Sequence, residues 1–258
     1  MIFARTITTL FLNCILFFSS QSCLAKPITP EWIINQKEDD FGDTVVYVWH
    51  DGARLVCKKF GCELLCKAPD WKVHCYNVAE KTEWIGDLSQ FSGVVMANPF
   101  AIPRAYQVAY LREVEAGEFA GLKYTKYRTP VSRKDLILAA SEIPVADEVG
   151  EFLSRLYVVP NSHNVPLFRD CDRGKGLQPE RFKIGAVRNG SANDLRGGVL
   201  HKLVTKSWKK TTFNSSDFEL PKGFERRKDI IQVSYSANKK EELGSFLNEL
   251  GFKTKVKP

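Results

Sequence analysis

Apolar and polar residues alternate with a short, regular period between Thr44 and Ile85. Runs rich in β-branched and aromatic residues are separated by turn signals such as Asp51-Gly52, which favours a hairpin. Connections this short join antiparallel neighbours, because a parallel pair needs a crossover of about a dozen residues or more. The pattern therefore predicts a mainly β (α+β) protein organised around an antiparallel meander, with strands at 44–49, 54–57, 62–66, 71–76 and 81–85.

The rest of the chain predicts further strands and a few short covering helices. Thr29 as an N-cap with Pro30 at the first helical position predicts a short helix that ends near Glu38. The segment 105–115 fits either a helix or a strand. We also expect helical turns at 87–91, 147–156 and 238–250, a compact turn at 217–224, a brief apolar segment at 136–141, and strands at 122–128, 156–160, 165–168, 182–187, 199–208 and 230–235.

The N-terminus has the pattern of a signal peptide. Arg5 precedes an apolar run at 10–18, and Cys23-Leu24-Ala25 suits cleavage after Ala25. The run is too short for a comfortable transmembrane helix, so we expect an exported, periplasmic or extracellular protein that does not span a membrane. A lipid anchor on Cys23 is the alternative, although Ser20-Gln21-Ser22 suits such a site poorly. The remaining chain divides into a main domain at 26–229 and a strand/helix appendage with a basic tail at 230–258.

The net charge of the chain limits the classes of partner that we expect. The chain carries a net charge of +7, and cleavage removes only Arg5, which leaves +6 (7 − 1). This mild basicity favours anionic surfaces, but the lysines and arginines lack the clustering of a nucleic-acid binder. We therefore expect no nucleic-acid partner.

Cysteine usage indicates disulfides or buried thiols. Export permits disulfides, and four of the cysteines left after cleavage lie in the meander, with Cys171 as the odd one. If the turns fall at 58–61 and 67–74, two pairs face each other. Zinc is the weaker alternative because the spacing lacks paired C-x2-C knuckles. The disulfide candidates are Cys57, Cys62, Cys66 and Cys75.

No catalytic chemistry is evident in the sequence. Nucleophile-elbow, phosphate-loop and zinc-protease motifs are absent, and the four histidines fall on separate elements. Asp170, Asp172 and Glu180 share one loop that is either a weak cation site or simply solvated. We expect a protein that is not an enzyme and that has no metal site and no cofactor.

Aromatic residues are the main candidates for a binding surface. Tyr47 and Trp49 share one face of a predicted strand, Trp71 begins another, and Trp84 lies near the end of the meander. They are either ordinary core residues or the wall of an apolar pocket, which would favour a hydrophobic ligand.

Several motifs in order resemble bacterial periplasmic lipoprotein-carrier-like domains of the LolA/LolB type and their uncharacterised exported relatives. The resemblance runs from about Gly42 to Glu225, and the 230–258 appendage and the clustered cysteines fall outside it. It rests on 46–76 with Trp49-His50-Asp51-Gly52-Ala53-Arg54-Leu55, on Val114 to Arg128, on Leu156-Tyr157-Val158-Val159 with Val165-Pro166-Leu167, and on Phe218-Glu219-Leu220-Pro221-Lys222-Gly223-Phe224.

The resemblance implies an antiparallel sheet curled into an incomplete β-barrel (half-barrel) with helices in its mouth. In the carriers that concavity holds acyl chains, and Arg54 matches the place of a pocket arginine. We therefore expect a non-enzymatic binding protein for a lipid or a lipidated partner. The alternative is a structural or protein-interaction module of the cell envelope, with the basic tail and its helix as the contact surface. The expected ligand-binding residues are Tyr47, Trp49, Arg54, Trp71, Trp84 and Tyr124.

Overall fold

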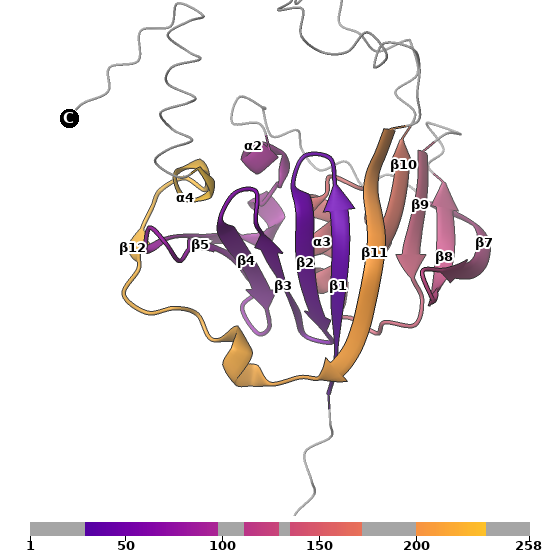
Figure 1. Ribbon diagram of the computed structural model, residues 1–258, viewed down its shortest axis with the longest axis horizontal. Coiled ribbons are helices and arrows are strands. Elements are labelled where there is room, and N and C mark those ends of the chain that lie inside the picture. Colours follow the sequence, from indigo (N-terminus) through magenta and orange to yellow (C-terminus); the bar gives the residue numbers. More distant parts are fainter. Residues whose placement is uncertain (1–28, 98–110, 129–134, 172–199, 236–258) are drawn as a thin grey trace, which may run out of the picture.

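A single large sheet dominates the structure, a computed structural model that describes residues 29–97, 111–128, 135–171 and 200–235. Within these residues the strand order is β12-β6-β5-β4-β3-β2-β1-β11-β10-β9-β8-β7 (Figure 1). The strands are β1 Pro30–Glu38, β2 Gly42–Trp49, β3 Gly52–Cys57, β4 Cys62–Lys67, β5 Lys72–Asn77, β6 Thr82–Asp87, β7 Arg112–Phe119, β8 Leu122–Arg128, β9 Asp135–Ala140, β10 Pro166–Cys171, β11 Leu200–Thr212 and β12 Glu225–Arg226. The short helices are η1 Leu88–Gln90, α2 Val94–Ala97, α3 Asp147–Leu156, η2 Ser215–Phe218 and α4 Ile231–Ser234.

The prediction of a mainly β protein with an antiparallel meander is confirmed. Strands β2 to β6 follow one another along the chain, and each pairs antiparallel with the next. From β6 the chain crosses to β7 at the far edge and returns through β8, β9 and β10 to β11, which pairs with β1. β12 is the exception, since it pairs parallel with β6.

The segment 30–38 is a strand, so the predicted helix there is wrong. Alternate residues of β1 face the core, beginning with the buried Trp32 and Ile34 and continuing with Gln36 and Glu38. A period of two is the pattern of a strand, and it overrides the capping signal of Thr29-Pro30. As a result β1 lies between β2 and β11 at the middle of the sheet.

Two other predicted strands are helical or irregular. The segment 156–160 begins with the last residue of α3, and Val158 has a positive φ of 54°, so the chain turns there instead of extending. The segment 230–235 forms α4, in which the N–H of Ser234 donates to the carbonyl of Ile230 at 2.9 Å. The predicted elements at 182–187 and 238–250 lie outside the described residues.

Different segments of the chain cover the two faces of the sheet. The helix face carries Ile34, Val46, Leu55, Leu64 and Cys75, which belong to one large core with side chains of α3. Figure 1 shows α3 behind β1 to β3. The strap face carries Tyr47, Trp49, Arg54, Leu65 and Tyr76, and part of it is covered by residues 213–224, called the strap below.

Candidate functional site

The six residues expected to bind a ligand lie on both faces of the sheet. Tyr47, Trp49 and Arg54 lie on the strap face, where the rings of Tyr47 and Trp49 pack against Phe218. Three others lie on the other side of the sheet and are half-buried against the core of the helix face. These are Trp71, Trp84 and Tyr124. The sheet itself separates the two groups, so the six side chains do not line one common pocket.

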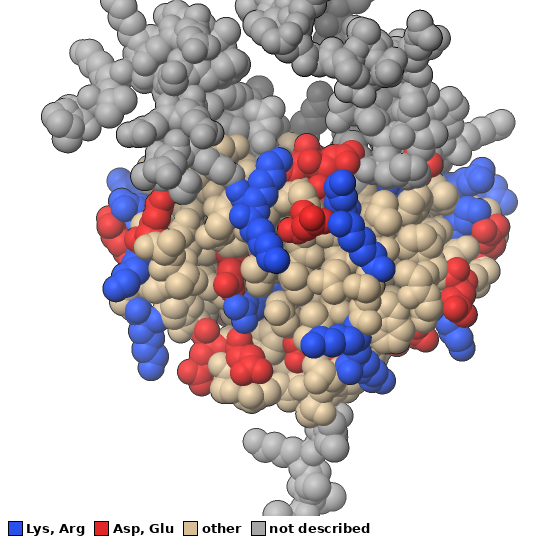
Figure 2. All heavy atoms as spheres, viewed as in Figure 1, with Lys and Arg blue, Asp and Glu red and all other residues tan. Residues whose placement is uncertain are grey.

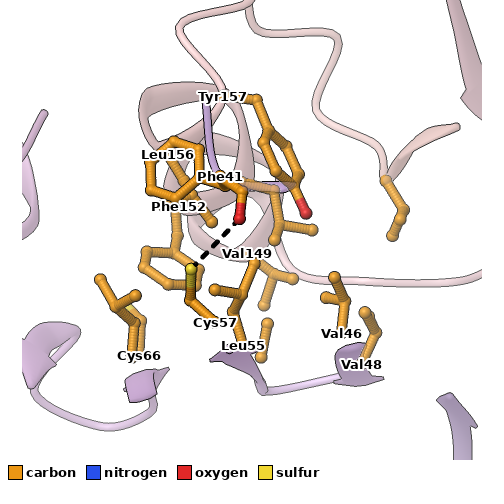
Figure 3. Close-up of a cluster of buried hydrophobic side chains, with 14 of the residues drawn as sticks. Phe41, Val46, Val48, Leu55, Cys57, Cys66, Val149, Phe152, Leu156 and Tyr157 are labelled. Carbon is orange, nitrogen blue, oxygen red and sulfur yellow. Dashed lines mark hydrogen bonds between the residues drawn. The ribbon is translucent and has the colours of Figure 1, made fainter. Parts of the chain in front are cut away.

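α3 fills the middle of the helix face. Its apolar residues recur at helical spacing, and Val149, Phe152, Leu153 and Leu156 are 0–1% exposed. Helices that bury one such stripe against a sheet are typical of α+β cores. Figure 3 shows Val149, Phe152 and Leu156 lying over the strands. α3 contacts β3 and β4 on one side and β10 on the other, so it spans strands that β2, β1 and β11 separate in the sheet.

The surface beneath α3 is apolar and includes four thiols. They lie on the helix face of β3, β4 and β5, and all are buried. Cys57 and Cys62 are directly opposite each other, as predicted, whereas Cys66 pairs with Val73 rather than Cys75. The four meander cysteines are thiols, and no disulfide joins them to one another in the described part of the chain. Burial raises the pKa of the Cys66 thiol to about 12, which keeps it neutral.

Beside these apolar residues a small polar group connects α3 to the sheet. The hydroxyl of Tyr157, at the end of α3, donates to Oε1 of Gln36 at 2.7 Å. Gln36 donates through Nε2 to the carbonyl of Pro166 at 2.8 Å and to Oγ1 of Thr205 at 3.0 Å. The group therefore joins β1, β11, the start of β10 and the end of α3 inside the core.

A buried carboxyl closes the β1–β2 hairpin next to this group. Oε2 of Glu38 accepts hydrogen bonds from the backbone N–H groups of Asp40 at 2.7 Å and Phe41 at 2.8 Å. Burial raises the pKa of Glu38 to about 7, against the effect of these two hydrogen bonds and with the help of the Asp40 charge. The sulfur of Cys57 donates to the carbonyl of Phe41 at 3.5 Å, which holds the hairpin over β3 (Figure 3).

On the opposite side of the sheet, two cations fasten the strap. Nη1 of Arg54 donates to the carbonyl of Asp217 at 2.9 Å, and Nζ of Lys67 donates to the carbonyl of Phe218 at 3.0 Å. These carbonyls end the short helix η2, where positive charge is favourable. Phe218 is 2% exposed, and its ring lies 4.3 Å from that of Trp49.

Arg54 also belongs to a polar cluster on the strap face. Its Nε donates to Oε2 of Glu63 at 2.7 Å, and the hydroxyl of Tyr76 donates to the same oxygen at 2.8 Å. The guanidinium lies 5.6 Å from the ring centroid of Tyr47. These contacts engage the guanidinium within the protein, so Arg54 serves here to anchor the strap. On the face turned away from α3, positive and negative side chains are interspersed (Figure 2).

The possible metal ligands and the histidines of the described residues are dispersed. None of their His, Cys, Asp and Glu side chains form a group of three or more that could hold a metal ion. His50 and His163 are exposed beside Asp51 and Asp147. Burial lowers the pKa of His74, whose Nδ1 is buried without a hydrogen-bond partner. His74 is thus held neutral as part of the packing on the strap face.

No helix in the described ranges is long and apolar enough to cross a membrane. No family model matches the chain, and no curated protein matches it. Among solved structures, an uncharacterized conserved protein from Thermus thermophilus is similar over 76% of this chain and 90% of its own, with 12% identity and a TM-score of 0.40. A likeness of this size supports no conclusion about function, and the resemblance to lipoprotein carriers stays a prediction.

Sequence reasoning missed the polar contacts between α3 and the sheet. Gln36 and Glu38 continue the series of every second residue that Trp32 and Ile34 begin. Reading 30–38 as a strand would therefore have placed all four on the core side. Tyr157 gave no such signal, because its role depends on a turn with an unusual backbone at Val158.

Proposed function

We propose that this protein is an exported, non-enzymatic binding protein that holds the acyl chain of a lipid or a lipidated partner against the helix face. The sheet acts as an incomplete barrel and α3 lies in its mouth, in the place that the ligand takes. Contacts of α3 with β3 and β4 on one side and β10 on the other support this curvature. So does the β7–β8 turn, where the carbonyl of Ala120 accepts from Nε1 of Trp208 at 2.8 Å.

The observation that carries the proposal is the composition of the surface beneath α3. Apolar side chains and buried thiols make up this surface, with the polar group of Gln36 at its margin. Burial of apolar area stabilises a contact by roughly 25 cal/mol per Å² without regard to direction. An acyl chain can therefore replace the apolar stripe of one short helix. The residues concerned are Val46, Val48, Ala53, Leu55, Cys57, Leu64 and Cys66.

Cys66 offers a direct test, because it lies beneath α3 and is 1% exposed. The purified native protein is first extracted for lipid mass spectrometry. The delipidated chain is then treated with a maleimide, with and without phosphatidylglycerol vesicles, and labelled peptides are mapped. We expect a bound acyl lipid in the extract and at least about tenfold slower labelling of Cys66 with vesicles, because the acyl chain then covers the thiol whenever α3 opens. Cys66→Ala controls for peptide assignment. No bound or exchangeable lipid across a panel, with unchanged labelling, would refute the proposal.

A structural or protein-interaction module is the second candidate, and the fastening of α3 favours it. Nη1 of Arg155 donates to the carbonyl of Ser89 at 2.8 Å, and the N–H of Gly93 donates to the carbonyl of Arg155 at 3.0 Å. A helix held this firmly is an ordinary part of a core. On this candidate Cys66 is labelled at the same rate with and without lipid, and the basic tail binds an envelope protein.

A truncated chain tests the second candidate, and the position of α4 determines where the chain can be cut. Ile230 and Val233 are buried in the main core, so cutting at Asp229 would remove part of that core. A chain that ends at Tyr235 keeps α4 and removes the tail. Loss of the pulled-down partner with an unchanged circular dichroism spectrum would support the second candidate, and an unchanged pull-down would reject it.

A further inference from the structure

β7 is the last strand of the sheet, and described residues pair with it on one side only, through β8. All its residues from Arg112 to Glu118 are exposed. Figure 1 shows β7 at the outer edge, beyond β8. An edge strand presents a row of backbone N–H and C=O groups that can accept another strand.

Pairing with β8 determines the direction of the β7 side chains. Oε1 of Glu115 lies 2.7 Å from Nζ of Lys126. A Cβ added at Gly117 would lie 2.7 Å from the hydroxyl oxygen of Tyr124, which packs against the core of the helix face. Glu115 and Gly117 therefore point toward the helix face, and Ala116 and Glu118 point the other way.

An irregularity in the pairing brings a second carboxylate to the same side as Glu118. The register shifts between Glu113 and Glu115, so Val114 is an extra residue opposite β8. Such a bulge reverses the alternation. Glu113, Ala116 and Glu118 therefore form one row, with the two carboxylates about 13 Å apart along the strand.

The C-terminal segment of the chain carries a complementary row of charge. It reads Phe-Lys-Thr-Lys-Val-Lys at 252–257 and lies outside the described residues. In an extended chain alternate side chains share a face, so Lys253, Lys255 and Lys257 would form one row. Lys253 and Lys257 would then be about 13 Å apart, the same spacing as the two carboxylates.

We propose that the edge of β7 binds the C-terminal segment 252–257 of this chain as an added antiparallel strand. In this register Lys253 lies opposite Glu118, Lys255 opposite Ala116, and Lys257 opposite Glu113. Opposite charges across a strand pair stabilise it, and like charges oppose it. The glutamates and the bulge therefore exclude strands that lack this basic pattern, in the way that charged edges prevent indiscriminate pairing.

Hydrogen–deuterium exchange on the full chain tests the proposal. It is compared with a chain that ends at Gly251, and β8 serves as the internal reference. We expect the amides of β7 that point away from β8 to exchange roughly tenfold faster after truncation, while β8 is unchanged. Equal exchange of β7 in the two chains would overturn the proposal.

A charge exchange separates pairing from a general loss of structure. Lys253→Glu with Lys257→Glu should give the fast exchange of the truncated chain. Adding Glu113→Lys and Glu118→Lys should restore slow exchange, whereas Glu219→Lys, at an exposed position outside β7, should not. Failure of this rescue would also overturn the proposal. Dilution distinguishes the two supporting arrangements, because pairing within one chain is independent of concentration and pairing between two copies is not.

Discussion

Tyr157 and Gln36 are joined by a buried hydrogen bond of 2.7 Å between Oη and Oε1, although 121 residues separate them in the sequence. Tyr157 is 3% exposed and Gln36 is 2% exposed. The bond ties the end of α3 to the middle strand of the sheet. It is therefore a polar contact between the helix and the apolar surface that we propose as the ligand site.

Replacing Tyr157 with phenylalanine tests how much this bond holds α3 in place. Phenylalanine keeps the ring that packs edge-on against Phe41 but removes the donor to Gln36. A buried acceptor left without its partner costs about 1–3 kcal/mol. We expect urea denaturation to show a loss of this size in the free energy of unfolding.

Tyr47→Phe is the matched control, because the ring of Tyr47 is only half-buried on the strap face. We expect it to change stability by less than about 0.5 kcal/mol. Equal effects of the two substitutions would mean that the Tyr157 hydroxyl contributes nothing specific.

Glu38 makes stability depend on pH in a defined direction. The pKa of its carboxyl rises from 4.5 to about 7 on folding, chiefly through burial. Between these values the native state binds more protons than the unfolded state, so the free energy of unfolding falls as pH rises. The contribution is complete below pH 4.5 and disappears as pH passes 7, at a cost of up to roughly 3 kcal/mol.

Glu38→Gln should flatten this part of the stability curve. The amide oxygen of glutamine can still accept from the N–H groups of Asp40 and Phe41, so the hairpin is retained while the titration is removed. Urea denaturation at a series of pH values between about 4 and 8 measures the difference. Glu219→Gln, at an exposed position, should keep the slope of the natural chain, and an unchanged slope in Glu38→Gln would contradict the assignment.

The strands of the meander were predictable because each has its own local signal. Asp51-Gly52 marks a turn, and alternation in β5 places Val73 and Cys75 on one face. The same local reasoning failed at 30–38, where a good capping signal competed with a weaker period of two. The segment 30–38 forms a strand because β2 and β11 pair with it, one on each side. A local sequence pattern does not contain this information.

Assignment of residues to one site was less predictable than the strands. Alternation correctly put Tyr47 and Trp49 on one face, but nothing in the sequence showed which face would receive α3 and which the strap. That choice depends on packing between segments far apart in the chain, such as Phe218 on Trp49. The predicted turn at 217–224 did supply the residue that covers this patch.

Phe218→Ala tests whether the strap belongs to the main folding unit. Its ring contacts Trp49 and stacks on Phe213 at 5.2 Å between centroids. Truncation of a buried phenylalanine costs about 3–5 kcal/mol. We expect denaturation to show this full loss if the strap unfolds with the sheet. Phe224→Ala, at a half-buried position, is the control and should cost less. A normal denaturation midpoint with fast hydrogen exchange confined to 213–224 would instead show a strap that opens by itself.

Gly93→Ala tests how firmly α3 is held, because Gly93 touches the end of that helix. A Cβ on Gly93 would lie 1.9 Å from the carbonyl oxygen of Leu156. Backbone atoms on both sides must shift, so we expect a loss of about 3 kcal/mol or more in the free energy of unfolding. Gly61→Ala is the control for conformation alone, since its φ is +64° and no atom lies within 4 Å of the added Cβ. It should cost about 1 kcal/mol.

If α3 can leave the sheet while the rest stays folded, Gly93→Ala will also speed maleimide labelling of Cys66 under native conditions. If α3 is inseparable from the core, labelling will rise only in proportion to global unfolding, which would favour the interaction module over the lipid-binding protein.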